Sequence, residues 1–532
     1  MYDVVIVGAG PVGLFLACEL GLADCSVLVL EQEPQPRTPW RVMPLGLRGL
    51  SATSVGTFHR RGMLQELLEA SGIDNYPGAG PGAGPDAGPD AGPDADEPAP
   101  PARVGHFAGL VLDPANVDVA ALPFRLSGPA PEPMLTSLEA VESVLFERAV
   151  KLGVEIRRGV TVSAVTQYDE NVVAHAGDDE YAGRWLVGCD GGRSTVRRLT
   201  GFEFVGTEPQ FTGYTMLADI ADPEKLRPGI NPTPMGIYLQ MAGYLSVMEF
   251  DGGAFDRSQP PSHAHLQAVL RRVSGTDVTL NEVHLASSYT DRAKLTTTYR
   301  QGRVLLAGDA AHIHSPLGGQ GLNVGIGDAL NLGWKLAATV HADANARANP
   351  RAHAPDGLLD TYTRERHPVG EWVVEWTRAQ VATLQPGPHG RAVQAVVRDL
   401  LGTRDGTTYM FEKLSGASVR YDLGSGDPGS EHPLVGRNAP ELRLEDGTRL
   451  GDLMQEGRGV VLDFTPDRRL REAAKGWDER VRYVAGPARN DLGLDAVLVR
   501  PDGVVAWAGA RGFDDRAPFE RAAAHWFGTP TA

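Results

Sequence analysis

The first thirty residues constrain the fold more than any other part of the chain. Val4-Val5-Ile6-Val7 is a short apolar run typical of a buried strand, and a second strand is expected at 26–30. Between them, Gly8-Ala9-Gly10-Pro11-Val12-Gly13 ends the first strand, and the apolar spacing of residues 14–22 predicts a helix. This order of strand, glycine turn, helix and strand predicts an α/β fold with a Rossmann-like domain.

The glycine motif carries the features of a dinucleotide site. Gly8 permits a tight turn, Gly10 lets a pyrophosphate approach the backbone, and Gly13 allows close packing of helix on strand. The helix start offers unpaired N–H groups to phosphates, and Glu31 can bind ribose hydroxyls at the end of the second strand. The alternative is a packing turn without a ligand, and the motif does not separate FAD from NAD. The predicted contacts are Gly8, Gly10, Pro11, Val12, Gly13 and Glu31.

A second glycine-rich segment, after a strand at 303–307, favours a flavin. Asp309 can accept hydrogen bonds from a polyol such as a ribityl chain, and the glycines let a flat ring lie against the backbone. The positive end of the next helix, expected from about 321 to 340, can stabilise a reduced flavin. The alternative is a glycine-rich helix start and nothing more. The predicted contacts are Gly308, Asp309, Pro316, Gly318, Gly319, Gln320, Gly321, Leu322 and Asn323.

A third segment, Gly188-Cys189-Asp190-Gly191-Gly192-Arg193-Ser194, also follows an apolar strand. Asp190 and Gly191 can form a turn near the pyrophosphate, and Arg193 adds positive charge. Alone, Asp-Gly is usually only a turn. Together with the other two segments, it predicts one bound FAD.

These three segments resemble the fingerprints of group A flavoprotein monooxygenases, the p-hydroxybenzoate hydroxylase-like family. Residues 299–312 and 318–323 are most similar to the bacterial aromatic polyketide hydroxylase branch. The resemblance implies that NAD(P)H, a transient co-substrate, reduces FAD, that O2 forms a flavin C4a-hydroperoxide, and that one oxygen atom passes to an aromatic substrate. It also implies no permanent second nucleotide domain for NAD(P)H.

The resemblance and the pattern along the chain together predict three domains. The FAD-binding domain takes residues 1–75, 126–200 and 291–400, and a β-rich substrate domain takes 76–125 and 201–290. Residues 424–532 resemble a thioredoxin-like C-terminal domain without a CxxC pair. Residues 77–101 consist almost wholly of Gly, Ala, Pro and Asp, so an extended or disordered loop is expected there.

Composition excludes several other classes of protein. The net charge of −17 argues against nucleic-acid binding, and no apolar run approaches the length of a membrane span. We therefore expect a cytoplasmic protein. Cys18, Cys25 and Cys189 form no metal-ligand spacing, so we expect no metal and three buried small side chains.

The chain departs from the family pattern at two places on the expected cofactor surface. The loop at 41–54 is longer than in many relatives, and Thr53 stands where the family motif has an arginine. Arg48 is the candidate flavin-side catalytic arginine and Arg41 the second candidate, each with a solvated loop arginine as the alternative. Pro316 is the other catalytic candidate. Met134 marks the second departure, where a glutamine is common.

The substrate is expected between the β-rich domain and the flavin. Strand residues Tyr214, Tyr238, Gln240, Tyr244 and Met248 are candidates to line that pocket, with ordinary packing as an equal alternative. His312 fits the family pattern and is expected to be structural. Hydroxylation of a polycyclic aromatic or a simpler phenol leads the hypotheses, ahead of Baeyer–Villiger oxygen insertion beside a ketone and of a non-enzymatic flavin-binding protein.

Overall fold

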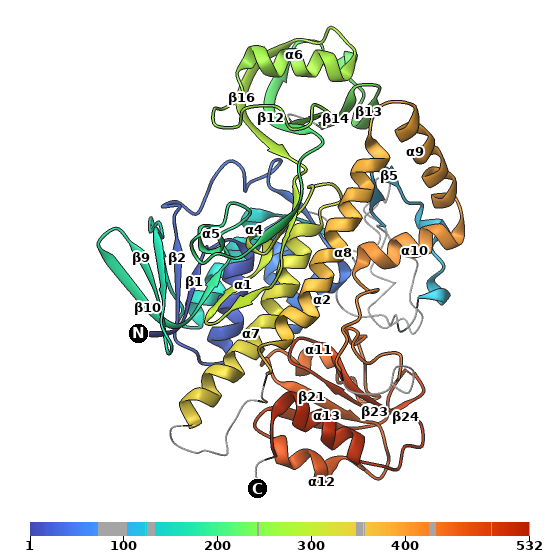
Figure 1. Ribbon diagram of the computed structural model, residues 1–532. Coiled ribbons are helices and arrows are strands. Elements are labelled where there is room, and N and C mark those ends of the chain that lie inside the picture. The colour runs from blue at the N-terminus through green and yellow to red at the C-terminus, as the bar shows by residue number, and fades with distance from the viewer. Residues whose placement is uncertain are drawn as a thin grey trace.

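The computed structural model describes residues 1–72, 104–122, 124, 133–241, 244–346, 355, 357–424, 432–490 and 492–530. Figure 1 shows a Rossmann-like α/β domain in the centre, a β-rich domain above it and a smaller α/β domain below. The extended loop expected at 77–101 lies outside the described residues.

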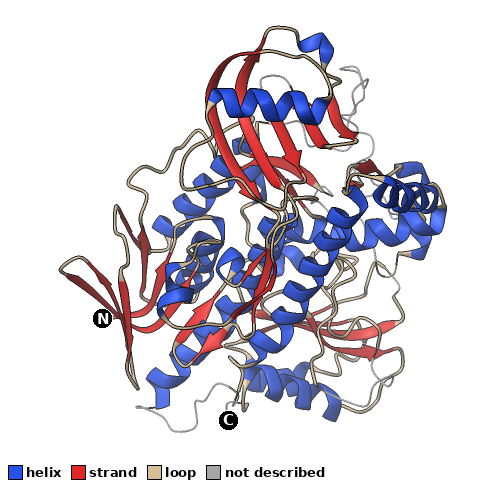
Figure 2. Ribbon diagram, turned by 45° about the horizontal axis from the view of Figure 1, so that its top comes forward, coloured by secondary structure: helices blue, strands red, loops and turns tan. Residues whose placement is uncertain are grey.

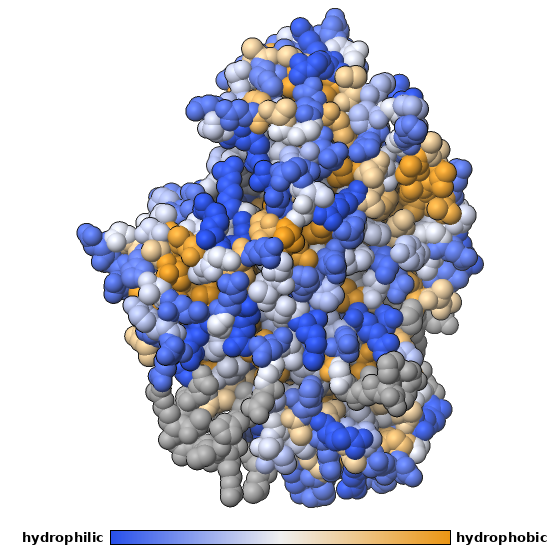
Figure 3. Space-filling view, in the orientation of Figure 1, coloured by the Kyte–Doolittle hydropathy of each residue, from blue (hydrophilic) through white to orange (hydrophobic). Residues whose placement is uncertain are grey.

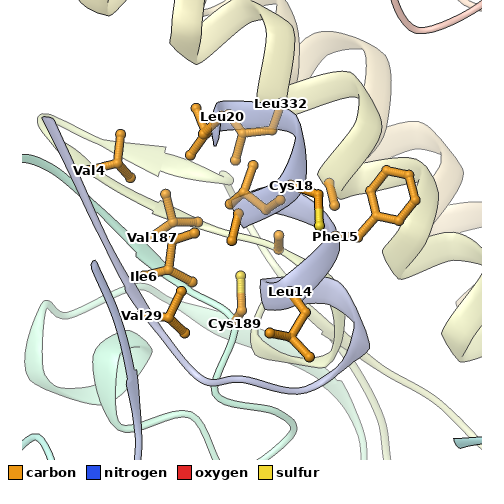
Figure 4. Close-up of a cluster of buried hydrophobic side chains, with 14 of the residues drawn as sticks. Val4, Ile6, Leu14, Phe15, Cys18, Leu20, Val29, Val187, Cys189 and Leu332 are labelled. Carbon is orange, nitrogen blue, oxygen red and sulfur yellow. The ribbon is translucent and has the colours of Figure 1, made fainter. Parts of the chain in front are cut away.

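The central sheet has the strand order β18-β19-β10-β1-β2-β7, in which β19, β10, β1, β2 and β7 are parallel and β18 pairs with β19 antiparallel. Its strands are β1 (Tyr2–Val7), β2 (Val27–Glu31), β7 (Glu155–Arg158), β8 (Ala164–Gln167), β9 (Val172–Ala176), β10 (Asp179–Gly188), β18 (Arg300–Gln301) and β19 (Val304–Leu306). The core strands are almost wholly apolar because both faces are covered. Figure 4 shows Val4, Ile6 and Val187 on the strand side of this core and Leu14 and Leu20 on α1, with Phe15 pointing away from these strands.

Helices cover this sheet. The domain contains α1 (Pro11–Leu22), α2 (Ala52–Arg60), α3 (Leu64–Ser71), α4 (Leu138–Lys151), α5 (Thr195–Leu199), α7 (Gln320–Ala346) and α8 (Thr361–Leu384). Gly62, with φ of +67°, separates α2 from α3. Cys18, Cys25 and Cys189 are buried, as expected.

A short antiparallel pair carries the chain into α4. β3 (Leu47–Leu50) pairs with β6 (Met134–Ser137), and the Ser137 side chain accepts a hydrogen bond from the Ala140 N–H at 3.1 Å. Such an N-cap satisfies one of the unpaired N–H groups at a helix start.

Ser137→Ala should therefore lower the free energy of unfolding by about 1 kcal/mol. Urea unfolding followed by circular dichroism measures this change. Ser137→Asp keeps an acceptor at the cap and should retain most of the stability. Equal losses in both variants would contradict the capping role.

The β-rich domain is an antiparallel sheet covered on one face by a helix. It contains β12 (Thr212–Ile220), β13 (Gly229–Thr233), β14 (Gly236–Met241), β15 (Tyr244–Glu249), β16 (Leu280–Thr290) and α6 (His263–Ser274). The strand order is β13-β14-β15-β12-β16, and Figure 2 shows α6 lying across these strands. A three-stranded sheet of β11 (Phe204–Thr207), β17 (Ala293–Thr296) and β20 (His312–Ile313) lies at the junction with the central domain.

A further apolar cluster joins the lower face of the β-rich sheet to α8 and the helices after it. Besides α8 and the β-rich sheet, the elements that contribute residues to this cluster are β4 (His106–Phe107), β5 (Leu110–Val111), α9 (Pro388–Leu401) and α10 (Arg404–Ser415). The helices of this part of the chain extend to residue 415. Figure 3 shows an apolar patch over α9, where Val393, Val396 and Leu400 are exposed.

The C-terminal domain has its own sheet and core. Its elements are α11 (Leu450–Leu453), β21 (Gly459–Asp463), α12 (Arg471–Ala474), β22 (Val481–Ala485), β23 (Leu494–Val499), β24 (Val505–Ala510) and α13 (Ala517–Phe527). The strand order is β22-β21-β23-β24, with only β21 and β22 parallel. Among the described residues, no helix is both long and apolar enough to span a bilayer.

Candidate cofactor and active site

The three predicted cofactor segments leave the central sheet side by side. β1, β10 and β19 are adjacent and parallel, with Val7 opposite Gly188 and Gly188 opposite Leu306. Each predicted segment begins directly after one of these strand ends. In open α/β sheets, ligands bind outside the carboxyl ends of the strands, so this edge is where a dinucleotide belongs.

The three glycines of the first segment differ in what lies beside them. Gly8 has φ of +108°, and a Cβ there would lie 2.4 Å from the Cys189 carbonyl oxygen. A Cβ at Gly13 would lie 2.0 Å from the Gly8 carbonyl oxygen. Gly10 differs, because a Cβ there would meet no atom of the described residues within 4 Å. The fold therefore requires glycine at positions 8 and 13, because any side chain there would overlap the backbone. The space beside Gly10 is available to a ligand.

The start of α1 is also suited to phosphate. Gly10 is its N-cap and provides no side-chain hydrogen bond, and Pro11 occupies the first turn beside Val12. The free N–H groups and the helix dipole therefore favour an anion at this end. Glu31 is buried, and its carboxylate accepts hydrogen bonds from the N–H groups of Ala9 and Glu33 at 2.7 and 2.9 Å. Glu31 thus holds the glycine turn against the end of β2.

The segment after β10 is tied to the segment after β19. One oxygen of the Asp190 carboxylate accepts hydrogen bonds from the N–H groups of Thr195 and Val196, and the other oxygen is buried without a partner among the residues that the structure describes. Gly191 has φ of +75°, and Arg193 is exposed. Arg197 donates to the carbonyl oxygens of Gly192 and Ala310 at 2.9 and 2.8 Å, which joins the two segments.

The Gly308-Asp309 turn packs directly on the first glycine motif. Gly308 has φ of +64°, and a Cβ there would lie 3.0 Å from the Val12 side chain. The next residue, Asp309, is exposed at the strand end. The Gly308 N–H donates to the buried Asp328 carboxylate at 3.0 Å. An exposed carboxylate on a rigid turn is suited to binding hydroxyl groups of a polyol.

The glycine turn before α7 is held by side chains from other elements. Pro316 is exposed, Gly318 and Gly319 both have positive φ, and a Cβ at Gly318 would lie 3.0 Å from the Gln380 amide. A Cβ at Gly319 would meet no protein atom within 4 Å, so this position leaves space for a flat ligand. Gln320 is buried, whereas Gly321 and Leu322 are half-buried in the first turn of α7.

Asn323 connects this turn to the loop that departs from the family pattern. Its side chain accepts a hydrogen bond from the Ser51 N–H at 2.8 Å and donates to the carbonyl oxygens of Gly49 and Gly319. These contacts fix the end of β3 beside the start of α7. Asn323 therefore shapes the backbone around the predicted site.

Arg48 and Arg41, the two arginine candidates, have different surroundings. Arg48 donates to the carbonyl oxygens of Leu45 and Leu47, and burial lowers its pKa while Tyr244 and Asp309 oppose that shift. Arg48 thus lies between the β-rich domain and the Gly308-Asp309 turn. Arg41 instead forms an ion pair with Glu142 of α4, with Nε 3.2 Å from the carboxylate.

Glu142 is a half-buried carboxyl group among several charges. Burial raises the pKa of Glu142 to about 7, and this effect exceeds the opposite influence of Arg41, Arg158 and Arg48. Glu31 adds to the increase. The carboxyl group therefore titrates near neutral pH next to the predicted cofactor segments.

This shift predicts a pH-dependent stability. From about pH 4.5 to about pH 7 the native chain holds a proton at Glu142 that the unfolded chain has lost, so stability falls as pH rises through that window. Glu142→Gln should abolish this contribution, which amounts to about 3 kcal/mol. Urea unfolding of both proteins at pH 5 and pH 8 measures it. If the difference in unfolding free energy between the wild-type chain and Glu142→Gln were the same at pH 5 and pH 8, the raised pKa of Glu142 would be contradicted.

The substrate candidates divide between the two faces of the β-rich sheet. Tyr214 and Tyr238 are buried in the core under α6, where the Tyr214 hydroxyl lies 2.8 Å from His265 Nε2. Tyr238 accepts a hydrogen bond from the Arg227 N–H, and the Gln240 amide donates to nearby carbonyl oxygens. Tyr214 and Tyr238 therefore show the ordinary packing that was the alternative to lining a pocket.

Tyr244 and Met248 lie on the opposite face. Tyr244 is close enough to Arg48 to influence its pKa, and Met248 packs against the apolar cluster that contains Leu317 and Ile237. Leu317 directly follows Pro316. This face of the sheet and the turn before α7 therefore enclose an apolar region beside the predicted cofactor segments.

His312 is fully buried, and its partner is a buried residue of α7 that was not predicted from the sequence. Its Nε2 lies 2.7 Å from the Asp328 carboxylate, and both side chains are fully buried. Asp328, Asn331 and Lys335 follow one another at helical spacing on α7 and are all buried. Polar residues at that spacing in an otherwise apolar helix are a signal that the sequence contained.

Comparison with known proteins agrees with this site. Residues 1–377 match the FAD binding domain family, and residues 432–530 match the aromatic-ring hydroxylase C-terminal family. A monooxygenase from Claviceps purpurea is 42% identical over 506 residues, which cover 95% of this chain and 94% of the relative. Rifampicin monooxygenase from Streptomyces venezuelae is 37% identical over the full length of both chains.

Solved structures show the same relationship. The OxyS anhydrotetracycline hydroxylase from Streptomyces rimosus superimposes with a TM-score of 0.80 and 34% identity, covering 100% of both chains. The family predicted from the three segments is thereby confirmed, together with a mixed α/β fold that contains an FAD-binding domain. The chain belongs to the FAD-dependent aromatic-ring hydroxylases and is an FAD-containing monooxygenase that consumes NAD(P)H and O2.

Proposed function

We propose that FAD lies across the ends of β1, β10 and β19. The observation that carries this placement is the convergence of three glycine-containing segments on adjacent parallel strand ends. The pyrophosphate is assigned to the start of α1 near Gly10, and the ribityl chain to Asp309. The flavin ring is assigned to the open backbone at Gly319, before α7.

We further propose that the substrate is a polycyclic, polyketide-like aromatic compound bound beside Leu317. Two supports are the relatives named for rifampicin and anhydrotetracycline, which match the whole chain. A third is the apolar cluster around Leu317, Ile237 and Met248, which suits a large aromatic surface. Tyr244 and Arg48 supply polar groups at the edge of this region.

Bound FAD supplies the redox chemistry, namely acceptance of hydride from NAD(P)H and activation of O2. The chain's own residues provide binding, orientation and exclusion of water. Arg48 and the start of α7 place positive potential where negative charge develops on the reduced cofactor. The apolar cluster beside Leu317 limits access of water to the reacting centre.

The test is NADPH oxidation by the purified FAD-loaded protein in the presence of polycyclic phenols, with NMR of the products. A substrate that stimulates oxidation and gains a phenolic hydroxyl supports the proposal. A new lactone carbon would instead identify Baeyer–Villiger insertion, which product mass cannot separate from hydroxylation. A bound flavin that excess NADPH never reduces, with or without these compounds, would contradict a monooxygenase.

A further inference from the structure

A buried aspartate on α7 controls the backbone of the Gly308-Asp309 turn. Asp328 has no exposed surface, and its Oδ2 accepts hydrogen bonds from the Gly308 N–H at 3.0 Å and from His312 Nε2 at 2.7 Å. Its Oδ1 accepts from Arg366 Nε at 2.7 Å. The carboxylate thus binds both the turn and the strand after it to the interior of α7 and α8.

Arg366 extends these contacts toward the C-terminal part of the chain. Besides Asp328, its guanidinium donates to the Val324 carbonyl and to the Tyr421 hydroxyl, each at 2.8 Å. Tyr421 belongs to the segment between α10 and the C-terminal domain, and its N–H donates to the Gly436 carbonyl. The preceding residue of α8, Glu365, binds Arg500 at the end of β23. Hydrogen bonds therefore connect the Gly308-Asp309 turn, through Asp328 and Arg366, to Tyr421, and the neighbouring Glu365 ties α8 directly to the C-terminal domain.

We infer that Asp328 is a positioning residue for the flavin, and that Arg366 and Tyr421 make the C-terminal part of the chain a support of the cofactor site. Gly308 adopts a positive φ, and its N–H has its acceptor on α7 rather than within the turn. The direction in which Asp309 points is therefore set by Asp328. This inference rests on the proposed contact between Asp309 and FAD.

Asp328→Asn tests the inference because it keeps the volume of the side chain. An asparagine has one acceptor oxygen, so its NH2 group must face either Arg366 or the donors of Gly308 and His312. We expect the Kd for FAD to rise at least about 10-fold, since hydrogen bonds to charged groups are the stronger ones. The visible absorption bands of the bound flavin should also shift.

Asp463→Asn is the matched control. Asp463 is likewise fully buried and accepts hydrogen bonds from the N–H groups of Thr465 and Leu470 and from the Tyr483 hydroxyl. It lies in the C-terminal sheet, away from the predicted cofactor segments. We expect a comparable decrease in Tm but an unchanged FAD affinity and flavin spectrum at a temperature where both variants are folded.

Tyr421→Phe tests the hydrogen bond between Arg366 and the segment before the C-terminal domain, because it removes only the hydroxyl that Arg366 binds. We expect a smaller rise in Kd, about threefold. An unchanged Kd and spectrum in Asp328→Asn, or an equal loss of FAD affinity in Asp463→Asn, would overturn the positioning role. If Tyr421→Phe bound FAD with the same Kd as the wild-type chain, the C-terminal part of the chain would not support the cofactor site. Failure of the wild-type chain to bind FAD would instead overturn the proposed cofactor placement.

Discussion

Replacement of Gly10 by alanine should abolish tight FAD binding without damaging the protein. Gly10 has an ordinary φ of −75°, and an added Cβ meets no protein atom within 4 Å, so the fold tolerates the methyl group. The proposed pyrophosphate, however, occupies that space. We expect the Kd for FAD to rise about 100-fold, or about 2.7 kcal/mol. Titration of the apoprotein with FAD, followed by flavin fluorescence, measures the change.

Two other glycines provide controls for this result. Gly56→Ala in α2 also meets no protein atom within 4 Å but lies outside the predicted site, so FAD affinity should be unchanged. Gly13→Ala should lose both apoprotein stability and FAD binding, because its Cβ would lie 2.0 Å from the Gly8 carbonyl oxygen. A Gly10→Ala protein with wild-type affinity would place the pyrophosphate elsewhere. A parallel loss of apoprotein stability would show that Gly10 is required by the fold.

Arg500→Ala should cost about 3–5 kcal/mol of unfolding free energy, because it removes a buried cation from the Glu365 and Asp502 carboxylates and leaves Glu365 with the Lys335 ammonium, 2.9 Å away. Arg500 is fully buried and donates to both oxygens of Glu365 at 2.9 and 2.7 Å. Its Nε donates to Asp502 at 3.0 Å, and its guanidinium lies 4.3 Å from the ring centroid of Trp526. Urea unfolding at pH 7 measures the loss.

Arg272→Ala is the matched control for an exposed ion pair. Arg272 contacts Glu249 at 2.7 Å, but 48% of its side-chain surface is accessible, so solvent screens the interaction. We expect a loss of less than about 1 kcal/mol. If Arg500→Ala were no more destabilising than Arg272→Ala, the buried contacts would not hold the C-terminal domain to α8. A selective loss of the C-terminal domain's signal would show that the two parts unfold separately.

The local features of the cofactor site were predictable from the chain. A strand followed by Gly8-Ala9-Gly10-Pro11-Val12-Gly13 defines its own turn, because the φ angles and the close approach of backbone depend on a few consecutive residues. The same is true of Gly308-Asp309 and of Asp190-Gly191. Their convergence also followed, since parallel strands end at one edge of a sheet.

The substrate side could not be predicted in the same way. Alternation along β12 and β14 shows that the two faces of the strands differ, but not which face α6 covers. Tyr214 and Tyr238 therefore looked equal to Tyr244 as pocket residues. The packing of α6 buries the first two within the β-rich domain and leaves Tyr244 near Arg48.

The chain alone thus specified an α/β flavoprotein, because strands, glycine turns and helix starts are properties of neighbouring residues. The buried contacts behind the site came only from the tertiary structure. Asp328 meets Gly308 from 20 positions away and Arg366 from 38, and Arg500 meets Glu365 across 135. A buried charge needs a partner, but its position in the chain does not say which one, since the folding of distant elements selects the pair.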